Sequence, residues 1–234
     1  NMVFISFENL QKMSLEDMIT YVNELKIFLN ACPKKPENHY LETLYNFGTA
    51  NGIIAERVKL DCKKEYLVAG ISALKTVLKS RNPRKPDILL ATLYLHLGNM
   101  YCTYALVEST SKFCKKAIEY HNKSLSYFKR FGKDDEIGDV NNNLGNDFVI
   151  LALEENLETN CKIAINCFNE ALESRSKEKK PIKYAETQNN LGNAYRLLCR
   201  IRNFPENSQK AIEHYSEALS IYEREGLKEY YRGT

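Results

Sequence analysis

The chain has 234 residues, of which 44% are hydrophobic and 27% charged, a balance typical of a folded globular protein. Its 10 Gly and 6 Pro argue against disorder and against an all-β fold rich in turns. The formal net charge of +3 is too small to indicate a nucleic-acid partner by itself, and no apolar run approaches the roughly 18 residues that span a bilayer.

The seven cysteines do not form a disulfide or zinc pattern, since none belongs to a C-x-x-C pair. Cys114 and Cys161 lie 47 residues apart, at a position where Ser208 follows. That series indicates a small packed side chain, so we expect reduced thiols, no metal, no cofactor and a cytoplasmic protein. His121 falls where Phe168 and Tyr215 follow in later copies, which predicts a buried core histidine.

The first predicted element is a helix that begins after Ser14, whose hydroxyl can cap it. Val22 and Leu25 continue an apolar stripe at helical spacing, and Pro33 ends it. Residues 1–36 are therefore predicted to form an N-terminal helical cap or half-repeat.

A repeat of 47 residues organises the remainder of the chain. The triplet at 191–193, Leu-Gly-Asn, recurs at 144–146 and 97–99, and a looser copy, Phe-Gly-Thr, stands at 47–49. A second recurring position follows each of the three Leu-Gly-Asn triplets and holds alanine, at 117, 164 and 211. A fixed period in this range predicts stacked helical repeats.

The repeats are placed at 37–83 (degenerate), 84–133, 134–180 and 181–228, with 229–234 as the start of a further, truncated repeat. Residues 231–234 align with 184–187, 47 residues earlier, so the sequence ends just as another helix begins. Because solenoids need a polar cap at each end, we expect this chain to be cut from a longer array.

The ordered pattern of Leu-Gly, an aromatic residue three positions later, then Ala, aromatic and Ala resembles the tetratricopeptide repeat over residues 37–234. The resemblance implies an all-α fold, a right-handed solenoid of antiparallel helix pairs whose first helices line a concave groove. The period exceeds the family's usual length of about 34 residues, so we expect longer helices. The repeats also look like the Leu-Gly-Asn repeat adaptors of spindle orientation and like long-period repeats of bacterial and archaeal signalling proteins.

Asparagine recurs on the first helix of each pair, although its side chain competes for backbone hydrogen bonds and disfavours helix interiors. On the resemblance, these carboxamides would face the groove and bond the backbone of an extended peptide. The alternative is that they are solvated, or bond adjacent repeats together. The candidate peptide-binding residues are Asn46, Asn99, Asn142, Asn143, Asn146, Asn189, Asn190, Asn193 and the cation Arg196.

No catalytic motif is present, so an enzyme is not expected. The acidic run at 134–136 is explained by its place at a predicted helix start. A carboxylate clamp for peptide C-termini is disfavoured because Asp139 and Glu186 stand where a clamp cation would sit. The expected function is therefore a protein-interaction scaffold that binds an extended peptide or partner segment.

Two other functions stay open. The chain could be the regulatory repeat arm of a larger enzyme or signalling ATPase whose catalytic domain lies outside it. Basic residues in the connections between repeats, at 34–35, 84–85, 130, 133 and 179–180, could instead bind nucleic acid along one edge. Cations also suit helix C-termini, which explains the same residues without a ligand. The oligomeric state is not readable from the sequence.

Overall fold

The computed structural model describes residues 5–31, 38–82, 86–108, 110–201 and 203–227. The chain divides into two compact units, Asn1–Ser109 and Thr110–Thr234. All regular secondary structure in the described residues is helical. The division falls between two helices that the sequence assigned to the same repeat, 84–133.

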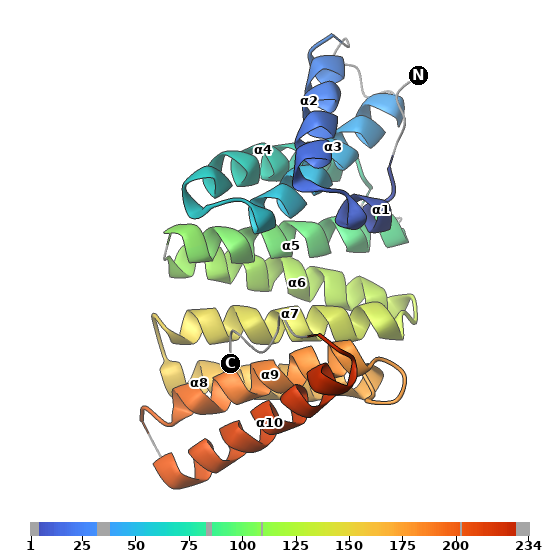
Figure 1. Ribbon diagram of the computed structural model, residues 1–234. Helices are drawn as coiled ribbons and strands as arrows, with labels where there is room; N and C mark the ends of the chain where they lie inside the picture. The colour runs from blue at the N-terminus through green and yellow to red at the C-terminus, as the bar shows by residue number, and fades with distance from the viewer. Residues whose placement is uncertain (1–4, 32–37, 83–85, 109, 202, 228–234) are drawn as a thin grey trace. The chain divides into compact units, whose positions relative to one another are not determined.

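The first unit contains α1 (Phe7–Lys12), α2 (Leu15–Ala31), α3 (Asn38–Arg57), α4 (Leu60–Lys79) and α5 (Ile88–Glu108) (Figure 1). Helix α3 is its centre, because α1, α2, α4 and α5 all pack against it. Leu25 of α2 and Ile54 of α3 are fully buried in the shared core. The short helix α1 was not predicted from the sequence.

The second unit contains α6 (Ser111–Arg130), α7 (Asp134–Ala152), α8 (Leu157–Ser174), α9 (Pro181–Leu198) and α10 (Phe204–Arg224) (Figure 1). Each helix packs on the next one along the chain, and α7 also contacts α9. The core between α8 and α9 is built from Phe168, Leu191 and Ala194, all nearly or completely inaccessible.

The helices begin and end at residues whose local chemistry suits a terminus. The Ser14 hydroxyl accepts a hydrogen bond of 3.1 Å from the backbone N–H of Asp17 at the start of α2, as predicted. Asn156 and Asn203 adopt left-handed backbone angles just before α8 and α10, and Gly132 and Gly226 do so just after α6 and α10. Asn and Gly are the residues that adopt this conformation most readily.

Glycine in the repeated triplet allows an aromatic ring of the following helix to approach the backbone. A Cβ added to Gly192 would lie 2.6 Å from the ring of Tyr215, and one added to Gly145 would meet the ring of Phe168 at even shorter range. The glycine is therefore a packing requirement, since no other residue fits under the ring.

The predicted all-α solenoid of helix pairs is confirmed within each unit. Helices α3 to α10 have 18 to 21 residues each, as the long period predicted. The right-handed twist and the repeat boundaries stay predictions, and the truncated repeat at 229–234 lies outside the described residues.

Candidate functional site

The candidate asparagines occupy three repeat positions on α3, α5, α7 and α9, and the structure gives each position different surroundings. The first position holds Asn142 and Asn189, directly before the second, which holds Asn46, Asn143 and Asn190. The third is the last residue of the triplet and holds Asn99, Asn146 and Asn193.

The first and second positions meet between adjacent repeats of the second unit. Asn190 Nδ2 on α9 donates a hydrogen bond of 3.1 Å to Asn142 Oδ1 on α7. The Thr187 hydroxyl also contacts that oxygen at 3.1 Å. Asn142 is only 6% exposed, so its carboxamide is enclosed by α9. These two asparagines thus link repeats, which is the alternative that the sequence left open.

The same two repeat positions meet in the first unit with different side chains. Tyr45 on α3 has its hydroxyl 3.3 Å from His96 Nε2 on α5. The His96 ring also lies 4.7 Å from the Phe7 ring of α1, centroid to centroid. Burial lowers the pKa of His96 to about 4 and raises the pKa of Tyr45 to about 12, so both are neutral at pH 7.

A buried cation supports the link between α7 and α9. Arg175, which follows α8, is 4% exposed. Its guanidinium donates to Asp139 Oδ1 at 2.8 Å and to the Thr187 hydroxyl at 2.9 Å. Lys183 pairs with the same carboxylate at 2.7 Å. Asp139 and Arg175 together therefore fix α7 against α9.

Glu186 lies near this cluster, with a carboxylate oxygen 4.0 Å from Arg175 Nη1. Burial raises the pKa of Glu186, and the nearby Arg175 and Lys183 partly offset that rise. Arg175 was not among the residues predicted from the sequence. The signal that could have found it is a charged residue at a repeat position that holds Phe128 and Tyr222 in the neighbouring copies.

The third position is partly accessible on all three helices that carry an asparagine there. Asn99, Asn146 and Asn193 are all half-buried. Asn193 accepts a hydrogen bond of 2.8 Å from the Tyr215 hydroxyl, to which Arg196 Nε in turn donates at 3.3 Å. The structure therefore gives Asn193 and Arg196 a shared partner on α10.

Two candidate carboxamides have no hydrogen-bond partner among the described residues. These are Asn146 on α7 and Asn189 on α9, and both are half-buried. Asn143 is half-buried as well. Asn46 is 6% exposed, and its amide donates to the Glu42 carbonyl one turn earlier at 2.9 Å. Little of its side-chain surface is therefore accessible to a ligand. A role in peptide binding stays a prediction for all of these positions.

A buried His–Asp pair joins α6 to α7. His121 Nδ1 lies 2.6 Å from Asp147 Oδ2, and both side chains are completely inaccessible. The predicted burial of His121 is confirmed. Asp147 was missed, although it stands at a repeat position that holds Met100 and Ala194 in other copies. Its second oxygen, Oδ1, has no hydrogen-bond partner among the described residues.

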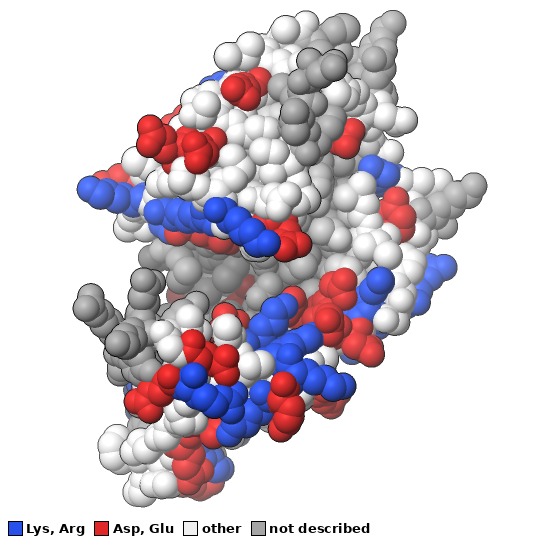
Figure 2. Space-filling model, turned by 45° about the vertical axis from the view of Figure 1, so that its right-hand side comes forward, with Lys and Arg blue, Asp and Glu red and all other residues white. Residues whose placement is uncertain are grey.

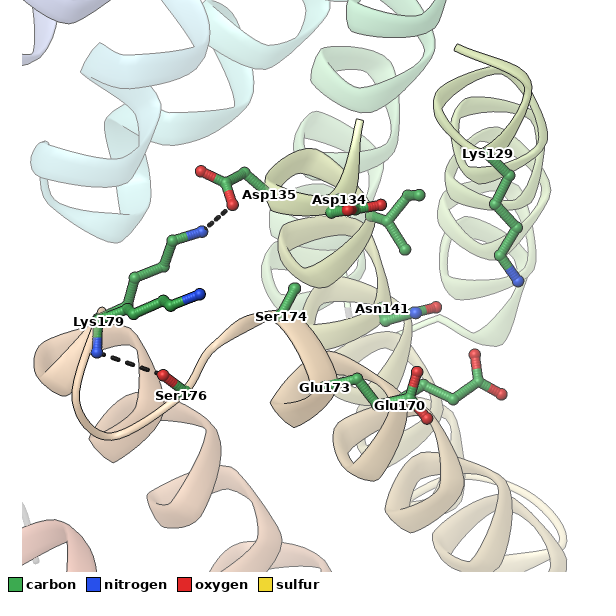
Figure 3. A pocket seen from close by; sticks show the side chains of 11 residues that line it. Lys129, Asp134, Asp135, Asn141, Glu170, Glu173, Ser174, Ser176 and Lys179 are labelled. Atoms are coloured by element: carbon green, nitrogen blue, oxygen red, sulfur yellow. Dashed lines mark hydrogen bonds and ion pairs between the residues drawn. The ribbon is translucent and has the colours of Figure 1, made fainter. Parts of the chain in front are cut away.

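A hollow of about 680 Å³ opens beside the start of α7 (Figure 3). Lys129 of α6, Asp134 of α7 and Glu170 of α8 line it, so both signs of charge face the space. Lys180 pairs with Asp135 there, and this hydrogen bond lowers the pKa of the Asp135 carboxyl. Asp134 and Asp135 therefore belong to the first turn of α7, and the hollow has no single charge that would select a ligand.

The predicted basic edge is only partly visible, because residues 34–35 and 84–85 lie outside the described residues. Cationic and anionic side chains are interspersed on the face shown in Figure 2. Of the described edge cations, Arg130 is exposed and Lys180 is paired with Asp135. This mixture gives little support to a nucleic-acid edge.

The described residues also lack the features of a metal site or a reactive thiol. No cluster of three or more His, Cys, Asp or Glu within the described part of the chain could hold a metal ion. Burial raises the pKa of the Cys114, Cys161 and Cys167 thiols to about 11, which keeps them protonated and unreactive. In the same ranges, every helix is too short or too polar to cross a membrane.

No family model matches the chain, and no curated protein matches its sequence. The crystal structure of BtubC (BKLC) from P. vanneervenii is similar over 95% of this chain and 94% of that chain, with 17% sequence identity and a TM-score of 0.49. A similarity of this degree carries no conclusion about function.

Proposed function

We propose that this chain is a tetratricopeptide-like protein-interaction module of the cytoplasm, which holds an extended segment of a partner against α7 and α9. The observation that carries the proposal is Asn146, a half-buried carboxamide of α7 without a hydrogen-bond partner among the described residues. A carboxamide offers two donors and an acceptor, which can bond a peptide backbone of any sequence.

The links between repeats support this role by holding neighbouring helices in fixed register. The bond between Asn142 and Asn190, together with the Arg175–Asp139 ion pair, fixes α7 relative to α9. Asn146 and Asn189, on these two helices, are then held at a constant separation. A rigid pair of helices lowers the entropy lost when a flexible peptide binds.

The test begins with peptides selected from a random library against the purified 234-residue chain. Replacing Asn146 and Asn189 by Ala should weaken a selected peptide at least tenfold, because two hydrogen bonds are lost. Asn166→Ala with Asn169→Ala is the matched control, since both of these asparagines are exposed on α8. Unchanged affinity in the Asn146 and Asn189 variant, or equal loss in the control, would contradict the proposal.

A further inference from the structure

Helix α1 covers the repeat positions of the candidate asparagines on α3 and α5 (Figure 1). The Phe7 ring lies against His96, which holds the second position on α5. Phe7 and Gln11 together line a small cavity with Thr49, which holds the third position on α3. The segment that precedes α2 therefore occupies a surface built by the repeats.

The same repeat positions are more accessible in the second unit. On α3 and α5, Asn46, Thr49 and His96 are buried, and only Asn99 is half-buried. All four counterparts on α7 and α9 are half-buried. They are Asn143, Asn146, Asn190 and Asn193. A segment of the chain thus covers, in the first unit, a surface that stays partly accessible in the second.

Few contacts hold α1 in place. Leu10 is its one buried side chain, in a core that it shares with Ile54 of α3. Arg57 of α3 donates hydrogen bonds to the carbonyls of Gln11 and Met13, the latter at 2.7 Å. An isolated helix shorter than roughly 12–15 residues is marginal in water, so six residues are helical here because they bind α3 and α5. Helix α1 therefore resembles a bound ligand on a tether.

The tether and a neighbouring hollow set what could replace α1. Only Met13 and Ser14 connect α1 to α2, and a tether this short gives an effective concentration on the order of millimolar. A separate segment must therefore make contacts that α1 does not make. A hollow of about 700 Å³ beside the start of α1 offers them, with Leu41 and Tyr45 of α3 and Leu89 of α5 in its wall.

We propose that α3 and α5 form a second binding surface, which α1 occupies as an intramolecular ligand and which a helix of a partner protein takes in its place. The partner helix presents an aromatic and an aliphatic residue three positions apart, as Phe7 and Leu10 do, and its N-terminal end extends into the hollow. Recognition of a helix in a groove uses anchors at this spacing. The surface shares no residue with Asn146 and Asn189, so it can succeed or fail independently of the proposed function.

Hydrogen exchange of the unsubstituted 234-residue chain tests whether α1 leaves its surface. The Leu10 amide donates to the Ser6 carbonyl at 2.9 Å. We expect this amide to exchange at least a hundredfold faster than amides in the middle of α3, because α1 opens while the unit stays folded. Equal protection would mean that α1 opens only when the unit unfolds, and this result would overturn the proposal.

A fluorescent peptide of residues 5–13 tests whether the surface binds a separate helix. In anisotropy, it should bind saturably to the full chain carrying Phe7→Ala with Leu10→Ala, whose own α1 is detached, and at least tenfold more weakly to the unsubstituted chain. Gln11→Pro, which breaks α1 without removing a core side chain, should expose the surface in the same way. The peptide carrying Leu10→Asp is the matched control and should not bind.

Three results of the peptide experiment would overturn the proposal. The first is no binding to either folded variant, and the second is equal binding to the variants and the unsubstituted chain. The third is global unfolding of both variants in circular dichroism, because α1 would then be part of the core and not a replaceable ligand.

Discussion

Asn190 of α9 donates a hydrogen bond of 3.1 Å to Asn142 of α7, and this bond joins two neighbouring repeats. The contact between Tyr45 and His96 occupies the same two repeat positions in the first unit. A conserved geometry with different side chains indicates a structural link between helices. Some asparagines of the repeat therefore join neighbouring helices, whereas the half-buried Asn146 and Asn189 have no hydrogen-bond partner among the described residues.

The link between repeats can be tested by its effect on stability. Asn142→Ala removes an acceptor that is used by both Thr187 and Asn190. Asn166→Ala, at an exposed site on α8, provides the same gain in helix propensity without a lost bond. In urea unfolding, we expect Asn142→Ala to be less stable than Asn166→Ala by about 1–2 kcal/mol. Equal stability would show that the link contributes nothing.

Acid should weaken the first unit through His96. Its folded pKa is about 4 against an ordinary value of 6.5, so below pH 6.5 the unfolded chain binds a proton that the folded chain does not. The free energy of unfolding then falls as pH drops from 6.5 towards 4, by up to about 3 kcal/mol. His96→Gln should lack this component when urea unfolding is measured at pH 7, 5.5 and 4.5. Parallel pH profiles for the two proteins would refute the assignment.

The buried His121–Asp147 pair should be replaceable by the residues that the next repeat uses. Asp147→Ala alone removes the carboxylate that lies against His121 Nδ1 and should cost about 3 kcal/mol. The equivalent positions, Phe168 and Ala194, already pack together in one core cluster. His121→Phe combined with Asp147→Ala should therefore recover most of the loss in a double-mutant cycle. Additive losses would mean that the two side chains do not interact.

A helix glycine that packs against an aromatic ring and one that packs against a flexible side chain should respond differently to an added methyl group. Gly145→Ala places a Cβ against the ring of Phe168 and should lower stability by about 1–3 kcal/mol. A Cβ added at Gly52 would lie 3.1 Å from the end of the flexible Met100 side chain. Because Ala also has the higher helix propensity, Gly52→Ala should leave the stability of the protein unchanged or raise it. Thermal unfolding of both variants checks this, and equal destabilisation would contradict the packing argument.

The helices were predictable because their signals are local. Apolar spacing and the cap at Ser14 act within a few positions of where they stand, and the period of 47 residues repeats such local signals along the chain. The short helix α1 was missed because six residues carry too little periodicity.

The division among the asparagines could not be predicted in the same way. Asn189 and Asn190 are adjacent in sequence, yet Asn190 bonds to the preceding repeat whereas Asn189 has no hydrogen-bond partner among the described residues. Helical periodicity places both on one polar face and does not say which neighbour each one meets. Arg175 and Asp139 are likewise 36 residues apart, so their contact depends on how α7, α8 and α9 pack.

The most direct measurement compares the affinity of one library-selected peptide for Asn146→Ala and Asn142→Ala by isothermal titration calorimetry, with urea unfolding of both. We expect Asn146→Ala, tested alone, to lose about five- to tenfold in affinity while its stability is unchanged. Asn142→Ala should chiefly lose stability. If Asn146→Ala binds the peptide as tightly as the unsubstituted chain, the proposed binding surface is wrong.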